Sequence, residues 1–80
     1  MDRTSIFNVA ALRQEMILLT INEIIESLNK KGYNAENQLV GYLLTGDPTY
    51  ISNYEGAREK IKTLKREEVL LALIKSYEGL

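Results

Sequence analysis

The chain has 80 residues, enough for one domain, and its ten basic and eleven acidic residues give a net charge of -1. It contains no cysteine and no histidine, which excludes disulfides, the usual thiolate and imidazole zinc sites, and a histidine acid or base for catalysis. The balanced charge gives no long-range attraction to nucleic acid or anionic lipid, and no apolar run reaches the ~18 residues of a membrane span.

These limits predict a non-enzymatic cytoplasmic protein without a cofactor or a metal. A chain of this size buries a core that supplies only ~3 to 5 kcal/mol, and small domains are usually reinforced in some further way. Because disulfides and the usual zinc sites are excluded, self-association is the remaining common route.

The first predicted element is a long helix. Residues 1–8 are expected to form a flexible N-terminal tail, and residues 9–80 a single helical domain. Asn8 is a favourable N-cap, and the segment from Val9 to Lys31 contains no glycine or proline. At 100° per residue, one broad apolar face predicts the core side of the helix, and a smaller patch lies opposite it and requires another cover. The core face consists of Ile17, Leu18, Ile21, Ile24, Ile25 and Leu28, and the opposite patch of Leu12, Met16 and Leu19.

A short second helix is predicted from Asn34, as its N-cap, to Gly46. Gly41 in its interior costs ~1 kcal/mol relative to alanine, which indicates a close approach by a neighbouring helix. Asp47 and Pro48 then suit the N-cap and first position of a new helical turn. The apolar residues of this helix surround most of its circumference and predict an interior position; they are Leu39, Val40, Leu43 and Leu44.

Two further helices are predicted at the C-terminal end, although no breaker separates them. Ser52 and Glu55 have capping-box spacing, so the third helix is expected to start near Asn53, and the fourth runs from about Arg66 to Tyr77. The expected inward residues are Tyr54, Ala57, Ile61 and Leu64 in the third helix and Leu70, Leu73, Ile74 and Tyr77 in the fourth. The predicted class is therefore all-α, a compact bundle of four to five helices.

The turn between the second and third helices invites a test for ligand binding. A glycine before a helix N-terminus often holds phosphate, but Asp47 would repel an anion here, and the cap roles of Gly46 and Asp47 are favoured. The nearby tyrosines are expected to pack sideways with their hydroxyl groups in water. If the turn does bind a ligand, we expect a protein lying across Tyr42, Tyr50 and Tyr54.

Three cations, Arg58, Lys62 and Lys65, fall along one helical stripe if the third and fourth helices are continuous. Such a stripe could receive a nucleic-acid backbone or a nucleotide. Glutamates are interleaved with it, and a solvated face of ion pairs is the favoured interpretation. A nucleic-acid-binding or nucleotide-binding module is kept as the alternative function, and a purely structural dimerisation module as a third.

The stretch KGYNAENQLVGYLLTGDPTYI, followed by AREKIKTLKREEVLLALIKSY, resembles the IreB family of small cytoplasmic proteins from low-GC Gram-positive bacteria. Near the start, Asp2, Thr4 and Phe7 match the family's D-x-T-x-x-F arrangement. The most specific resemblance lies in the turn, which carries Gly41, Tyr42, Gly46, Asp47, Pro48 and Tyr50.

The resemblance implies an all-helical, homodimeric regulator without catalytic activity. It implies phosphorylation on threonine by a membrane Ser/Thr kinase with extracellular PASTA repeats, reversed by a cognate phosphatase. Family members act as negative regulators in the cell-envelope stress and cephalosporin-resistance pathway. Thr4 inherits the phosphoacceptor position, and the downstream protein is not identified.

The residues themselves support this expectation, because a mobile polar tail is accessible to a kinase. Thr4 has that advantage and Ser5 shares it. We hypothesise that phosphorylated Thr4 docks on Arg58, Lys62 and Lys65 of its own or the partner subunit. For the dimer interface, the candidates are Leu12, Met16 and Leu19.

Overall fold

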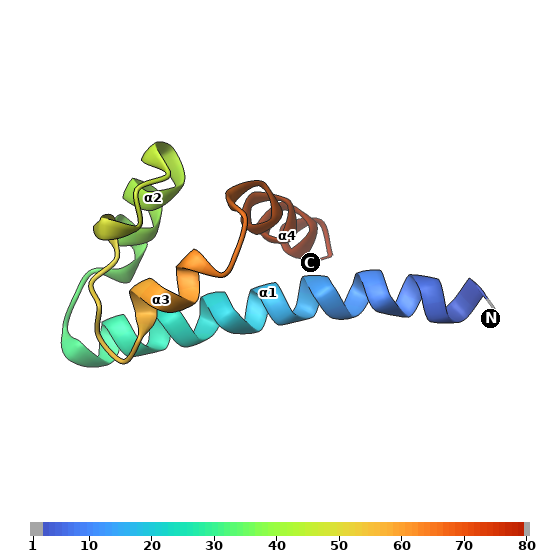
Figure 1. Ribbon diagram of the computed structural model, residues 1–80, viewed down its shortest axis with the longest axis horizontal. Helices are drawn as coiled ribbons and strands as arrows, with labels where there is room; N and C mark the ends of the chain where they lie inside the picture. Colours follow the sequence, from blue (N-terminus) through green and yellow to red (C-terminus); the bar gives the residue numbers. More distant parts are fainter. Residues whose placement is uncertain (1–2, 80) are drawn as a thin grey trace.

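The computed structural model describes the backbone of residues 3–79 and the side chains of residues 9–79. Its elements are α1 (Arg3–Lys31), α2 (Ala35–Thr45), the 3₁₀ turn η1 (Pro48–Tyr50), α3 (Ala57–Lys62) and α4 (Arg66–Glu78). No strand occurs in this range, so the predicted all-α class is confirmed. α1 runs along the 45 Å length of the molecule, and α2, α3 and α4 lie on one side of it (Figure 1).

α1 is longer than predicted. Its 29 residues span about 43 Å at 1.5 Å per residue, and it begins at Arg3 instead of following Asn8. Asn8 therefore lies inside the helix, and its prediction as N-cap is wrong, because continuing a helix adds one hydrogen bond for each residue fixed. Residues 1 and 2 of the predicted tail, and the side chains of residues 3–8, lie outside the described residues. The predicted core face is confirmed: four of its residues are buried and Leu18 and Ile25 pack against them.

The ends of α2 follow the sequence prediction. Asn34 Oδ1 accepts a hydrogen bond from the Asn37 N–H at 3.1 Å, and Gly46 takes the left-handed conformation with φ of 76°. The predicted interior position holds for one side only, since α2 packs mainly on α1 and η1, and Leu39 and Leu43 lie partly buried against the core. Ala35 and Tyr42 occupy that side, whereas Val40 and Leu44 are exposed.

The start of α3 also differs from the prediction. The helix begins at Ala57, after Glu55 and Gly56 both adopt positive φ. Ser52 makes no cap, because its N–H donates to Gln38 Oε1 at 2.8 Å and its hydroxyl accepts from Gln38 Nε2 at 3.0 Å. Glu55 accepts a hydrogen bond from Lys30 Nζ at 2.8 Å. Both residues of the predicted capping box therefore bind side chains from other helices, Gln38 of α2 and Lys30 of α1.

α4 is a separate helix, but its predicted inward face is wrong. Val69 and Ala72 are buried against the rest of the core, whereas the four residues expected inside are exposed: Leu70, Leu73, Ile74 and Tyr77. α4 packs mainly on α1, and two small side chains allow the helices to approach closely. These four larger apolar residues are left on the outer side, where no other element of the described part of the chain covers them.

Candidate functional site

The predicted phosphoacceptor lies in the first turn of α1. The backbone at Thr4 and Ser5 is helical, within Arg3–Lys31, and their side chains lie outside the described residues. The first four N–H groups of a helix have no partner within the helix, so its first turn opens at little cost. A kinase that needs an extended segment would therefore have to unwind only this turn.

The three cations predicted to form one stripe are not aligned. α3 ends at Lys62, and Lys65 is the N-cap residue of α4. Arg58 Nε donates to the Ile51 carbonyl oxygen at 2.8 Å, and Lys62 Nζ lies 3.5 Å from Glu59 Oε1. The continuous basic stripe on which the nucleic-acid alternative depended is therefore missing.

The two cations of α3, Arg58 and Lys62, lie far from Thr4 along α1. Lys60 Nζ of α3 lies 3.3 Å from Glu23 Oε2, which fixes α3 against the C-terminal half of α1. Thr4 and Glu23 are 19 residues apart in one helix, or about 28 Å at 1.5 Å per residue. The structure therefore does not bring Thr4 together with Arg58 and Lys62 of α3 within one chain, whereas Lys65 begins α4, which the Arg13–Glu68 ion pair ties to the N-terminal half of α1.

The patch predicted opposite the core face of α1 is exposed. Leu12, Met16 and Leu19 each leave more than half of their surface open, and Val9 extends the same row by one turn. We call these four residues the α1 stripe. Their spacing of three and four residues places them along one side of the helix, as in a helix that packs against a partner.

The structure exposes a second apolar surface, whose residues the sequence analysis had assigned to the core. Leu70, Leu73, Ile74 and Tyr77, which we call the α4 stripe, are exposed on the outer side of α4. Their spacing was recognised, but it was assigned to the core because periodicity does not reveal which side a neighbouring helix covers.

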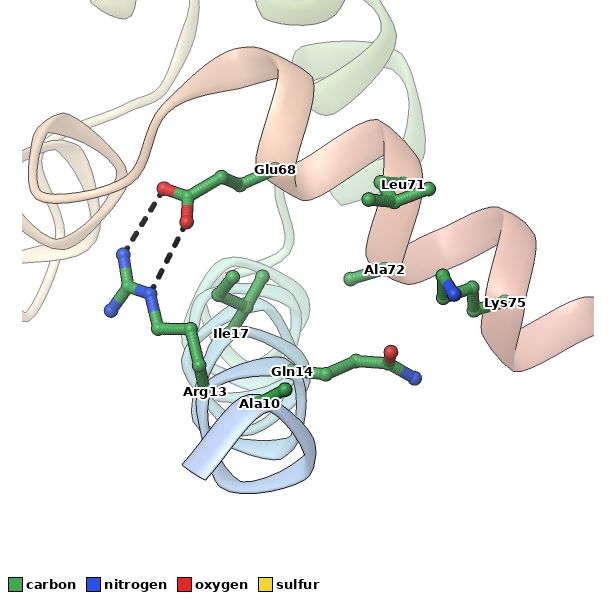
Figure 2. Close-up of a pocket in the computed structure, with 8 residues that line it drawn as sticks. All are labelled: Ala10, Arg13, Gln14, Ile17, Glu68, Leu71, Ala72 and Lys75. Carbon is green, nitrogen blue, oxygen red and sulfur yellow. Dashed lines mark hydrogen bonds and ion pairs between the residues drawn. The ribbon is translucent and has the colours of Figure 1, made fainter. Parts of the chain in front are cut away.

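A pocket of about 270 Å³ separates α4 from the N-terminal half of α1 (Figure 2). Across one end, the Arg13 guanidinium donates to both carboxylate oxygens of Glu68, at 3.3 Å from Nε and 3.2 Å from Nη2. This pairing lowers the pKa of Glu68 and raises that of Arg13. The remaining lining is mostly apolar, with Lys75 of α4 at the far end: Ala10, Gln14, Ile17, Leu71, Ala72 and Lys75.

Two further carboxylates have lowered pKa values. The hydrogen bond and charge of Lys30 lower the pKa of Glu55, and that contact ties α1 to the loop before α3. The hydroxyl and the backbone N–H of Thr49 both donate to Asp47 Oδ1, at 2.7 and 2.9 Å, and lower the pKa of Asp47. Both carboxylates are engaged in holding the fold.

The turn after α2 is built from helix caps, as predicted. Asp47 caps η1, in which Pro48 occupies the first position. The predicted close approach at Gly41 is confirmed, but by the side chain of Tyr50 instead of a helix: a Cβ atom added at Gly41 would lie 3.1 Å from Cγ of that ring. Tyr42 is only 6% exposed, so it cannot contribute to the expected protein-binding surface of Tyr42, Tyr50 and Tyr54.

The described residues also limit other kinds of site. Among the side chains of residues 9–79, no three His, Cys, Asp or Glu groups are placed so that they could hold a metal ion. None of the helices in that range combines the length and apolar character needed to cross a membrane.

Comparison with known protein families gives a match over nearly the whole chain. The family model described as "IreB regulatory phosphoprotein" matches residues 2–78 of the 80 residues. The matched span includes α1, α2, η1, α3 and α4. The chain therefore belongs to the IreB family of regulatory phosphoproteins.

Proposed function

We propose that the protein is a non-enzymatic cytoplasmic regulator, controlled by phosphorylation of Thr4 and acting by binding other proteins. The observation that carries the proposal is the match to a family of regulatory phosphoproteins, because it includes the position of Thr4. In this proposal a PASTA-type Ser/Thr kinase adds the phosphate and its cognate phosphatase removes it. The protein is a negative regulator of the cell-envelope stress response and antibiotic resistance in low-GC Gram-positive bacteria, through a downstream protein still to be identified.

The position of Thr4 in the first turn of α1 suits a reversible modification. The unmodified turn frays readily, so a kinase can bind it in an extended form. A phosphate adds about −1.5 to −2 charge, and negative charge near a helix N-terminus is favoured by about 0.3 to 1 kcal/mol. Phosphorylation thus favours the helical form of the turn, and the phosphatase has to unwind it again.

The distance between Thr4 and α3 limits which subunit could supply cations to a phosphate on Thr4. With Thr4 in α1, the cations of α3 in the same chain are about 28 Å away along the helix. Docking on Arg58 and Lys62 therefore requires those residues of a second subunit, whereas Lys65 stands at the start of α4, the helix that the Glu68–Arg13 ion pair joins to α1. Lys65 is exposed, whereas Arg58 would first give up its hydrogen bond to the Ile51 carbonyl oxygen.

A homodimer formed through the α1 stripe is part of the proposal. The four residues of the α1 stripe lie in one row and are exposed in a single copy of the chain. A stable interface usually buries about 800 Å² on each partner, more than four half-exposed side chains provide, so neighbouring parts of α1 would have to contribute. A two-fold axis across α1 would cover this row in both subunits.

The proposal is tested by phosphorylation with the purified catalytic domain of a PASTA-type kinase, followed by mass spectrometry of the full-length protein. We expect phosphate on Thr4, with incorporation abolished by Thr4→Ala and retained in Ser5→Ala. The matched control is Thr20→Ala, which should have no effect, because Thr20 lies within α1 and its hydroxyl donates to the Met16 carbonyl oxygen at 2.9 Å. Absence of phosphate on Thr4 in the parent protein would reject the proposal.

A further inference from the structure

The outer side of α4 has the spacing of a helix that binds in a groove. Leu70, Leu73, Ile74 and Tyr77 stand at positions i, i+3, i+4 and i+7 and are 39–78% exposed. Amphipathic helices that enter hydrophobic grooves use this set of anchor positions. The α4 stripe is therefore a formed helical ligand held on the surface of the domain.

The α4 stripe belongs to the same half of the molecule as Thr4. The Arg13–Glu68 ion pair joins α4 to the N-terminal half of α1, and Ala10 and Lys75 line the pocket between the two helices (Figure 2). Ala10 is six residues from Thr4, or about 9 Å along the helix. A protein seated on α4 is thus close to the first turn of α1.

We propose that the α4 stripe is the docking surface for the kinase that phosphorylates Thr4, and that it enters an apolar groove with basic residues at its rim. This inference rests on the proposed function. Unwinding the first turn of α1 presents only a few residues to an active site, so a second contact has to supply most of the affinity. Two linked contacts also raise the effective concentration of Thr4 at the active site.

Charge on α4 indicates the chemistry of the groove. Glu67 and Glu78 lie 11 residues apart, three turns of helix, on the same flank of the α4 stripe. Neither takes part in a salt bridge among the described side chains, those of residues 9–79. An acidic flank beside an apolar row is complementary to an apolar groove rimmed by lysine or arginine.

The same flank disfavours a second copy of this chain as the occupant. An antiparallel pair of α4 helices would place Leu70 opposite Tyr77 of the second copy and Leu73 opposite Ile74. In that arrangement the flank carrying Glu67 and Glu78 faces the same flank of the second copy. Glu67 of each copy would then lie near Glu78 of the other, and this repulsion weakens the pair.

The test measures initial rates of Thr4 phosphorylation by the catalytic domain of a PASTA-type kinase, over a range of full-length protein concentrations. We expect Ile74→Glu and Tyr77→Glu to raise KM about tenfold or more with kcat unchanged, because each removes a contact equal in ground and transition state. Leu44→Glu, which adds the same charge at an exposed position of α2, should leave KM within about twofold. Glu67→Lys should also raise KM, because it reverses the charge presented to the basic rim.

Each result bears on a different part of the argument. Thr4 phosphorylation with the same KM in all four variants would overturn docking on α4 and leave the proposed function standing. No phosphate on Thr4 in the parent protein would reject both. If sedimentation finds the parent dimeric and Ile74→Glu monomeric, the occupant is a second copy and the docking inference is wrong. Circular dichroism checks that helix content is unchanged, as expected for substitutions at exposed positions.

Discussion

The substitution Leu19→Glu tests the proposed dimer interface most directly. Leu19 is 62% exposed in a single copy of the chain. Full burial of a leucine is worth about 1.5 to 3 kcal/mol, so covering this fraction is worth about 1 to 2 kcal/mol on each subunit. A two-fold interface contains the residue twice, and a loss of about 2 to 4 kcal/mol raises the dimer Kd about 30- to 700-fold.

Analytical ultracentrifugation over a range of concentrations, with the parent and the variant side by side, measures this change. The matched control is Leu44→Glu, which adds the same charge on α2 at a position 78% exposed and outside the α1 stripe. We expect the control to have the Kd of the parent protein. Both side chains point away from the core, so both variants should retain the helix content of the parent by circular dichroism.

The reasoning would be refuted if Leu19→Glu formed dimers with the parent Kd. A parent protein that stayed monomeric at all concentrations would remove the dimer itself from the proposal. If only Leu44→Glu raised the dimer Kd, the interface would lie on α2, and the exposed residues of that helix would be the ones to substitute next.

Three further predictions concern the stability of the fold, each measured by urea unfolding. Asn34→Ala should lower the free energy of unfolding by about 1 kcal/mol, because it removes the α2 cap. Asn34→Asp should retain most of the stability, because a carboxylate also accepts a hydrogen bond from the Asn37 N–H. Equal losses in the two variants would show that this hydrogen bond is not the source of the stability. Gly41→Ala should destabilise by about 1 to 3 kcal/mol, because the added methyl group meets the Tyr50 ring. Once Tyr50→Ala has removed the ring, the same Gly41→Ala change should stabilise by about 1 kcal/mol through helix propensity, and a loss in both backgrounds would contradict this explanation. Arg13 lowers the pKa of Glu68 in the folded protein, so the stabilisation from this contact is complete above the ordinary glutamate pKa of about 4.3 and is lost as the pH falls through the lower folded value. When the pH is lowered below about 4, the urea concentration at the unfolding midpoint should therefore decrease, and it should decrease less in Glu68→Gln than in the parent. An equal decrease in both proteins would rule out this ion pair as a cause.

Local signals in the sequence predicted the elements whose determinants are local. Asn34, Gly46 and the Asp47-Pro48 pair act on backbone groups within a few residues, and the structure places each cap where the sequence indicated. The core face of α1 was predictable because its apolar residues recur with the helical period over several turns. The all-α class followed from these features.

The predictions that failed concerned choices made by tertiary contacts. The spacing of Ser52 and Glu55 is that of a capping box, but Gln38 and Lys30 bind these two residues from elsewhere in the chain. For α4, the periodic apolar row was recognised correctly, yet Val69 and Ala72 fit closer to α1. A pattern within one helix does not reveal the shape of the surface that receives it.

The candidate site divides in the same way. The exposed side of Leu12, Met16 and Leu19 could be predicted from the helical period of α1 alone, and the structure confirms that these side chains are open. The alignment of Arg58 with Lys65 could not, because it required a continuous helix where the structure has two. The position of Thr4 relative to those cations depended on how far α1 extends.

α4 is attached to the rest of the molecule through the buried Val69 and Ala72, the exposed Arg13–Glu68 ion pair and a hydrogen bond from Arg66 Nη1 to the Leu43 carbonyl oxygen. Terminal helices with few buried residues are among the parts of a domain that open locally while the rest stays folded. A protein that binds α4 while it is packed on α1 would suppress such local opening. A second ligand of the same region would then bind without the entropy cost of ordering α4. Two ligands that never touch could in this way strengthen each other's binding, with no displacement of the backbone between the free and bound forms.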